Sequence, residues 1–302
     1  MPESAVASDL RSRYAFALQG RFPELSIEQL SLDLESGGDI VVVEWNGWQA
    51  LFPRSEAGAE QLAAMAAVMP HLRGFLSPAI PLWDVSSDGG DWSRSWRAAR
   101  RPEGRPLHPE LIVDPNRERL VRELAGFFHE LHCFSVERAR SLGAASFRSW
   151  RDEHETLARR AQSLLRPVLS WSEMTWTRHW WSRFLDDESL WKHEPALVHG
   201  SIAADCLLVD PLVRELAAVT GWQRMRVADP AVDFAALVDA YGADLGWRIV
   251  EHYGSLGSTA DASLFRRIRL QQTARRFRAV VAAADRDGVE SEAMTEAINR
   301  LR

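Results

Sequence analysis

The chain has 302 residues, of which 46% are hydrophobic and 26% are charged, a composition that excludes a disordered or fibrous protein. Its net charge of −6 argues against nucleic acid as a partner, and no apolar run approaches the roughly 18 residues of a membrane span. Two cysteines, Cys133 and Cys206, are too few for a disulfide framework, and the N-terminus shows no signal-peptide pattern. We therefore expect a cytoplasmic protein that contacts neither membrane nor nucleic acid.

The first hundred residues predict a small sheet with helices beside it. Helical periodicity predicts one helix over residues 9–22 and another from the N-cap Ser55 to Leu76. Turns are expected at Gly37-Gly38-Asp39 and at Asn46-Gly47, and the second pair is a strong hairpin signal. Apolar runs predict five strands, at residues 30–34, 40–43, 48–52, 78–85 and 92–98.

The segment Arg101–Pro106 is rich in proline and glycine and is the clearest linker in the chain. Beyond it, helical periodicity dominates. The predicted helices cover residues 116–134, 147–170, 174–187, 230–253, 264–284 and 290–301. Two short apolar runs, 207–209 and 216–220, flank the Asp210-Pro211 turn and predict a small hairpin. The chain thus divides into a β-rich part, residues 1–100, and a larger helical part, residues 101–302.

Two sequence blocks in the helical part carry a family resemblance. Residues 197–210 read LVHGSIAADCLLVD and resemble the catalytic loop H-G-D-L-x-x-x-N-x-L of aminoglycoside/macrolide phosphotransferases. Residues 219–235 read VTGWQRMRVADPAVDFA and resemble that family's V-I-D-W-x-x-A-x-x-G-D-P-x-x-D-L-A. Shorter matches lie at residues 52–54, 101–107 and 124–132. The resemblance implies an α+β, bilobal protein-kinase-like fold.

Three positions that carry the chemistry of this family hold other residue types here. Ser201 stands at the position of the catalytic base, and a hydroxyl cannot act as a general base near neutral pH. Cys206 and Gly221 stand where the family has the asparagine and aspartate that bind Mg²⁺. A thiol is a soft ligand and glycine has no side chain, so neither suits a hard cation.

The nucleotide side of the expected cleft has changed as well. Leu51 stands at the third-strand position of the cation that pairs with the nucleotide phosphates, and Met65 at that of the helical glutamate that orients it. The only lysine in the sequence, Lys192, lies beside the catalytic loop and cannot replace the missing cation on the third strand.

Three motif residues match the family and are expected to be structural. His199 should pack and hydrogen-bond within the loop, while Asp229 and Asp233 should accept hydrogen bonds from backbone groups at a helix start. Asp205 lies one residue before the lost asparagine. A solvated loop aspartate is the favoured interpretation, and a substitute metal ligand is the other.

Two further clusters of side chains have residue types that can form binding sites. His129, His132 and Cys133 share one helical face, but no acidic partner is identifiable, so no metal site is predicted there. A group of arginines on a late helix is expected to form a solvated, salt-bridged face rather than an anion site. Its members are Arg266, Arg267, Arg269, Arg275, Arg276 and Arg278.

The favoured functional hypothesis is a pseudokinase that binds a small molecule or a protein partner in the cleft, with no cofactor expected. The alternative is a weak or rewired phosphotransferase that uses ATP or GTP with Mg²⁺ and recruits Asp205 or Glu194. A third hypothesis is a different reaction in the same cleft, for which the sequence offers no nucleophile.

Overall fold

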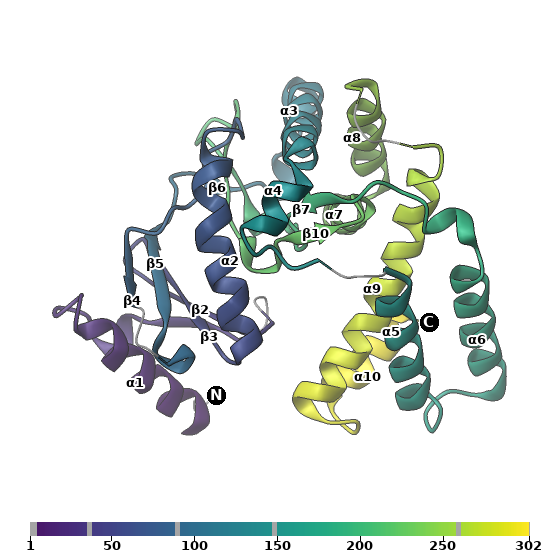
Figure 1. Cartoon of the computed structure of the whole chain (residues 1–302), viewed down its shortest axis with the longest axis horizontal. Helices are drawn as coiled ribbons and strands as arrows, with labels where there is room; N and C mark the ends of the chain where they lie inside the picture. Colours follow the sequence, from purple (N-terminus) through teal and green to yellow (C-terminus); the bar gives the residue numbers. More distant parts are fainter. Residues whose placement is uncertain (1–4, 35–37, 88–90, 147–149, 258–260, 302) are drawn as a thin grey trace.

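The N-terminal part of the computed structural model is an antiparallel sheet between two helices (Figure 1). The structure describes residues 5–34, 38–87, 91–146, 150–257 and 261–301, so residues 35–37 of the predicted first turn lie outside it. Within these residues the sheet has five strands in the order β1-β2-β3-β5-β4. The elements are α1 (Ala5–Gln19), β1 (Ser31–Asp33), β2 (Ile40–Trp45), β3 (Trp48–Pro53), α2 (Glu56–Arg73), β4 (Val85–Ser87) and β5 (Trp96–Arg100).

Residue alternation along β3 explains how the sheet is covered. Ala50 and Phe52 pack in the cluster that contains α1, whereas Leu51 packs on the opposite face in the cluster that contains α2. The Asn46-Gly47 turn has positive φ at both residues, 41° and 78°, as a two-residue hairpin turn requires. Ser55 caps α2 by accepting a hydrogen bond from the backbone N–H of Gly58 at 3.1 Å.

Two predicted strands of this part have the wrong extent. Residues 78–84 run outside the sheet, where Ala79 forms an isolated bridge to Ala218, because Pro81 has no N–H to donate to a ladder. Residues 92–94 form a single helical turn, since the Asp91 carboxylate accepts from the Ser93 N–H at 3.2 Å. The strands that form there are β4 and β5, which begin seven and four residues later than predicted.

The C-terminal part is mostly helical. The last strand of the N-terminal sheet ends at Arg100, next to the residue at which the sequence predicts the division into two parts. The division itself stays a prediction. Its first helices are α3 (Asp114–Cys133), α4 (Val136–Ser141), α5 (Trp150–Leu165) and α6 (Trp171–Leu185). The later ones are α7 (Ala231–Tyr241), α8 (Ala243–Ser255), α9 (Leu264–Asp287) and α10 (Glu292–Leu301). Short strands are β6 (Arg105–Pro106), β7 (Ala196–Val198), β8 (Leu207–Val209), β9 (Leu216–Val219) and β10 (Arg226–Ala228).

The structure corrects one helix prediction and adds one helix that was not predicted. The helix predicted over residues 230–253 is two helices, because Gly242 adopts a φ of 82° and breaks the run between α7 and α8. Helix α4 was not predicted. It is only six residues long, too short for its periodicity to register, and its N-cap Ser135 accepts from the Arg138 N–H at 3.1 Å.

The linker is tied to the helical part through β6. Arg105 pairs with Val209 of β8, and Gly104 adopts a φ of 140° with the place of a Cβ only 2.9 Å from the Leu208 Cβ. The β8–β9 hairpin then pairs in the same small sheet, while β7 pairs with β10. These pairings bring the two motif blocks of the sequence next to one another.

Two apolar clusters hold the helical part together. One is continuous from the α2 face of the sheet through α3, α7 and α8, and the other lies among α5, α6, α9 and α10 (Figure 1). Among the residues that the structure describes, no helix is both long enough and apolar enough to cross a bilayer.

Candidate functional site

The loop after β7 and the loop between β9 and β10 meet at the candidate site. The backbone N–H of Thr220 donates to the Cys206 carbonyl at 2.8 Å. The place of a Cβ on Gly221 is 2.5 Å from Cys206 Sγ, and that thiol in turn faces the Ser201 carbonyl at 3.5 Å. The structure therefore brings Ser201, Cys206 and Gly221 together, although they are up to 20 positions apart in the sequence.

Cys206 is buried, with 8% of its surface exposed. Burial raises the pKa of its thiol to about 12, with a further contribution from the Asp205 carboxylate. The sulfur is consequently a protonated thiol near neutral pH. A metal-binding or nucleophilic cysteine requires the thiolate, so this side chain serves as a small apolar filler.

Gly221 has a φ of 81°, in the left-handed region that side chains rarely adopt. Cys206 Sγ already occupies the space into which any side chain at residue 221 would grow. The residue types at positions 206 and 221 are therefore coupled, since the sulfur of Cys206 fills the space that a side chain at residue 221 would need.

Asp233, on the first turn of α7, anchors the loop after β7 through hydrogen bonds. Its carboxylate accepts from the backbone N–H of His199 at 2.9 Å and of Gly200 at 2.7 Å, and His132 Nε2 lies 3.3 Å from it. Burial alone would raise the pKa of Asp233, but these hydrogen bonds outweigh it and keep the pKa below its ordinary value. The same carboxylate thus fixes both α3 and the loop.

His199 is fully buried, and its tautomer follows from its partners. Nε2 donates to the Thr220 carbonyl at 2.7 Å, and Nδ1 accepts from the Ser201 N–H at 3.3 Å. Burial lowers the pKa of His199 against the opposing influence of Asp233. The neutral ring spans the two loops of the site and lies against Trp222 in a tilted arrangement, with ring centroids 4.7 Å apart.

Asp229 is buried at the start of α7. It accepts from the Ala231 N–H at 2.9 Å and from Arg267 Nε at 3.1 and 3.0 Å. Arg267 also contacts Asp261 through Nη1 at 2.8 Å. The interaction ties the second motif block to α9.

Asp205 and Lys192 are exposed, in contrast to the residues above. The Asp205 carboxylate lies 3.8 Å from Cys206 Sγ. Asp205 therefore lies within the loop block 197–210, at the edge of the buried residues around Cys206.

A profile of the phosphotransferase enzyme family matches residues 39–270, about three quarters of the chain. The chain belongs to the phosphotransferase enzyme family. It is 27% identical over 225 residues to viomycin phosphotransferase of Streptomyces vinaceus, covering 72% of this chain and 74% of that protein. It is 24% identical over 235 residues to the uncharacterized protein YcbJ of Bacillus subtilis (strain 168), covering 75% and 74%.

Solved structures show the same fold. A GDP complex of wild-type aminoglycoside 2'-phosphotransferase-IIIa superposes with a TM-score of 0.80 at 21% identity, covering 96% of this chain and 97% of that one. Macrolide 2'-phosphotransferase type I superposes with a TM-score of 0.70 at 21% identity, covering 100% and 99%. The expected α+β, kinase-like fold is confirmed.

The residues at the positions that the family resemblance assigns to metal binding do not fit Mg²⁺. Magnesium takes oxygen ligands in a near-ideal octahedron, whereas Cys206 offers a buried thiol and Gly221 offers no side chain. Within the described ranges, no group of three or more His, Cys, Asp or Glu side chains is arranged to hold a metal. His132 points into the core towards Asp233 and Tyr253, so it does not join Cys133 on a ligand face.

The two positions that the family resemblance assigns to nucleotide binding, residues 51 and 65, fit that role no better. Leu51 and Met65 are each 1% exposed, and both belong to the apolar cluster between the sheet and α2. The family resemblance assigns a phosphate-orienting cation and its carboxylate partner to these two positions, and the structure has two residues of one apolar cluster there.

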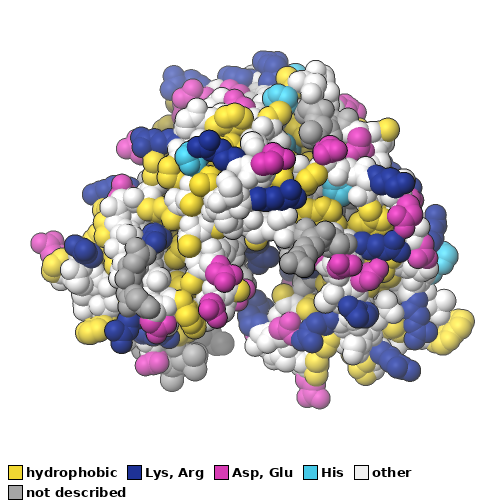
Figure 2. All heavy atoms as spheres, in the orientation of Figure 1, with side chains coloured by type: hydrophobic (Ala, Val, Ile, Leu, Met, Phe, Trp, Pro, Cys, Tyr) yellow, Lys and Arg dark blue, Asp and Glu magenta, His cyan; other side chains and the backbone are white. Residues whose placement is uncertain are grey.

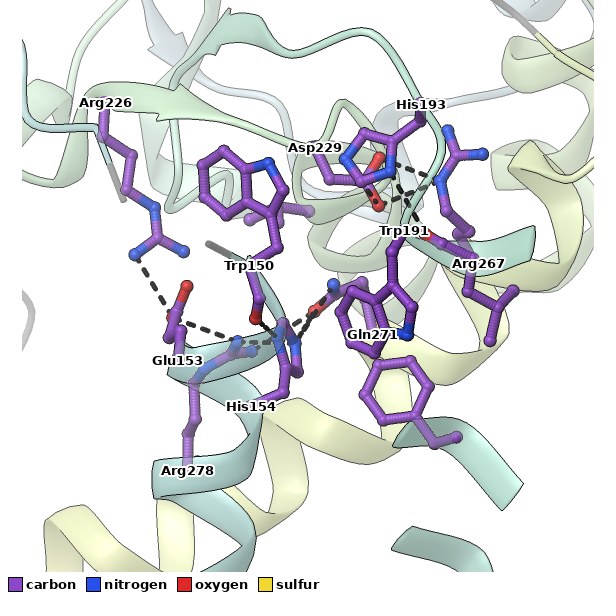
Figure 3. A pocket seen from close by; sticks show the side chains of 13 residues that line it. Trp150, Glu153, His154, Trp191, His193, Arg226, Asp229, Arg267, Gln271 and Arg278 are labelled. Atoms are coloured by element: carbon purple, nitrogen blue, oxygen red, sulfur yellow. Dashed lines mark hydrogen bonds and ion pairs between the residues drawn. The ribbon is translucent and has the colours of Figure 1, made fainter. Parts of the chain in front are cut away.

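The sequence interpretation missed a charged group between α5, α9 and β10 that borders a cavity with room for about one water, ≈ 10 Å³ (Figure 3). Glu153 Oε1 lies 3.5 Å from Arg226 Nη1 and 3.3 Å from Arg278 Nη2. The prediction of a solvated, salt-bridged arginine face is wrong for Arg267, which is 3% exposed, while Arg278 is half-buried and paired with Glu153. Their spacing held the signal: residues 267 and 278 fall on the same face of α9 as Ile268, Ala274 and Phe277.

Proposed function

We propose that this chain is a catalytically degenerate phosphotransferase, a pseudokinase that binds a small molecule or a protein partner in its cleft without transferring phosphate. The observation that carries the proposal is the packing of Cys206 Sγ into the space beside Gly221. A protonated thiol fills the place where metal-binding oxygens would stand. We also propose a cytoplasmic location, which is supported by the two free cysteines, Cys133 and Cys206.

The rate argument is consistent with this proposal. Losing a general base typically slows a reaction by about 10²–10⁴-fold, and Ser201 cannot supply one. A single loss of about 10⁴-fold would bring a kinase rate of about 1–100 s⁻¹ down to about 10⁻⁴–10⁻² s⁻¹. Leu51 and Met65 leave the phosphates without their usual orienting pair, so positioning is lost together with the base.

One observation favours a second candidate, a rewired phosphotransferase. Asp205 is exposed next to Cys206 and carries a carboxylate at the mouth of the site. Asp205 would have to serve as the base or as a metal ligand although it lies one residue before Cys206, the position of the family's metal-binding asparagine. This function would use ATP or GTP with Mg²⁺.

Turnover measurements separate the two candidates. The chain is incubated with ATP or GTP, Mg²⁺ and a panel of aminoglycosides, macrolides and sugars. We expect rates below about 10⁻² s⁻¹, the upper end of the range given above. A faster rate would overturn the pseudokinase proposal, and its loss in Asp205→Asn would identify the rewired enzyme.

A further inference from the structure

The two halves of α5 are held in place by different kinds of contact. Three of its buried residues belong to the apolar cluster among α5, α6, α9 and α10: Ala158, Ala161 and Leu165. The fourth, His154, continues the same face of the helix towards its N-terminus and is 2% exposed. Its ring contacts polar groups instead. The first two turns of α5, residues 150–157, therefore depend on hydrogen bonds for their docking, and the later turns on apolar packing.

Hydrogen bonds fix the protonation state of the His154 ring. Nδ1 donates to the Trp150 carbonyl at 2.7 Å. Nε2 faces two donors from α9, Arg278 Nη2 at 3.2 Å and Gln271 Nε2 at 3.3 Å. The Gln271 amide is oriented by Arg278, whose Nη1 donates to Gln271 Oε1 at 3.4 Å. Because a guanidinium can only donate, Nε2 must accept, and the docked ring is neutral.

The charged groups around His154 disfavour a proton on its ring. Among the described residues that line the cavity of Figure 3, there are three guanidinium groups and two carboxylates. A proton on His154 would add a fourth positive charge beside two negative ones, in a buried place where water screens little. The guanidinium groups are those of Arg226, Arg267 and Arg278, and the carboxylates are those of Glu153 and Asp229.

The other described neighbours of the ring supply no compensating negative charge. Phe184 and Trp191 lie against it, with ring centroids 5.1 and 5.6 Å away. His193, the other titratable side chain in the lining of the cavity, donates from Nδ1 to the Leu190 carbonyl at 3.1 Å. The docked arrangement is therefore built around an uncharged His154.

We propose that the junction of α5 with α9 and β10 is an acid-sensitive switch, in which one proton on His154 releases the first two turns of α5 while the later turns stay packed. The added proton on Nε2 would point at Arg278, so the ring and the guanidinium must separate. Burial and then the charge of Arg278 lower the pKa of His154 in the docked state, although Glu153 acts in the opposite direction. In the released state the ring meets water and its pKa returns to about 6.5, so the released form gains population below that pH.

The switch lies in the part of the molecule on one side of its main hollow. Figure 2 shows this hollow between the sheet part and the α5–α9–α10 part. The junction also includes β10 and Asp229 of the second motif block, so acidity alters the contact between that block and α5. The switch concerns movement and not phosphate transfer, and it goes beyond the proposed function.

Hydrogen exchange of backbone amides in the whole chain tests the switch. Rates at pH 5.5 and pH 7.5 are corrected for the intrinsic pH dependence of exchange, and residues 154–157 are compared with residues 162–165 of the same helix. We expect the corrected rates of the first group to rise about 10-fold at the lower pH, as a released histidine of ordinary pKa dictates. Those of the second group should change less than about twofold, because apolar packing does not titrate.

Three variants assign the response to the proposed groups. His154→Gln keeps a neutral side chain that can donate and accept, and it should abolish the acid response whatever its basal exchange rate. The matched control is His179→Gln, an exposed histidine of α6, which should respond as the wild type does. Arg278→Gln removes the opposing charge and should respond less than the wild type.

The proposal is overturned if residues 154–157 show no acid response or if both groups of amides respond equally. It is also overturned if His154→Gln or Arg278→Gln responds as the wild type does, or if His179→Gln abolishes the response. None of these outcomes bears on turnover, so a failure of the switch and a failure of the pseudokinase proposal are distinguishable.

Discussion

Two sets of side chains in one loop region have opposite characters. Asp233, His199 and Asp229 are buried and fully engaged, with hydrogen bonds to backbone groups at 2.7–2.9 Å. Ser201, Cys206 and Gly221 lie beside them yet offer no charged side chain for chemistry. We call the first set the frame of the site and the second set its reactive positions. The two sets are physically separable, because the hydrogen bonds of the frame stabilise the loop and the side chains at the reactive positions make no comparable hydrogen bonds.

The difference shows which contacts the fold depends on. Removing Asp233 would leave two backbone N–H groups and a histidine without an acceptor inside the protein, a large penalty. Replacing an oxygen ligand by Cys206 costs nothing comparable, since the thiol fills the space and needs no hydrogen-bond partner of equal strength.

The largest expected effect is that of Asp233→Ala. It removes the acceptor of His199 N–H, Gly200 N–H and His132, and breaking such a buried network costs about 3–5 kcal/mol. Urea unfolding followed by tryptophan fluorescence measures the change. Asp205→Ala, an exposed aspartate of the same loop, is the control and should stay within about 0.5 kcal/mol of wild type. A cost below about 1 kcal/mol for Asp233→Ala would break the comparison.

Gly221→Asp should be the next most damaging change. The left-handed φ and the 2.5 Å approach to Cys206 Sγ together predict a loss of about 2–4 kcal/mol. Adding Cys206→Ala removes the colliding sulfur and should recover about 1 kcal/mol or more of that loss. The unfolding free energies of wild type, Gly221→Asp, Cys206→Ala and the double variant form a double-mutant cycle that measures the coupling. Strict additivity would show that the two positions are not coupled.

Acid should destabilise the protein through its buried neutral histidines. Burial lowers the pKa of His199 and of His154, and Arg278 lowers that of His154 further. The folded state then binds fewer protons than the unfolded state below about pH 6.5, so stability falls as pH drops from there, by up to about 1.4 kcal/mol per pH unit for each group. His154→Gln should reduce this slope between pH 6.5 and 5. An unchanged slope would contradict the assignment.

Ser201→Ala should have the smallest effect. The hydrogen bonds found for Ser201 use its backbone N–H and carbonyl, so losing the hydroxyl should change the unfolding free energy by less than about 0.5 kcal/mol. Ligand binding should also be unaltered. A cost above about 1.5 kcal/mol would place Ser201 in the frame rather than among the reactive positions.

Much of the fold was predictable from local signals. The Asn46-Gly47 hairpin, the start of α2 at Ser55 and the β8–β9 hairpin all follow from turn and cap residues. The break at Gly242 was not predictable from periodicity, because apolar spacing continues from α7 into α8 and only the backbone conformation at one glycine interrupts it.

The part of the candidate site that lies in the two sequence motifs was predictable from the order and spacing of those motifs. Ser201, Cys206 and Gly221 meet as their motif spacing implied, but the packing of the sulfur against Gly221 requires coordinates. The reach of Arg224 to Gly38 joins residues 186 positions apart, and no periodic pattern encodes such a contact. Burial of Arg267 was readable in principle from the apolar face of α9.

The central claim is that both halves of the cleft have lost their chemistry, and restoring one half tests it most directly. The variant Ser201→Asp, Cys206→Asn, Gly221→Asp regains the base and metal-ligand types while Leu51 and Met65 stay apolar. ATP turnover is measured with Mg²⁺ against aminoglycosides, macrolides and sugars, after circular dichroism confirms that the variant is folded. The account predicts no turnover above about 0.1 s⁻¹, near the lower end for working kinases. A faster rate would show that the cleft still holds nucleotide in line and would contradict the account.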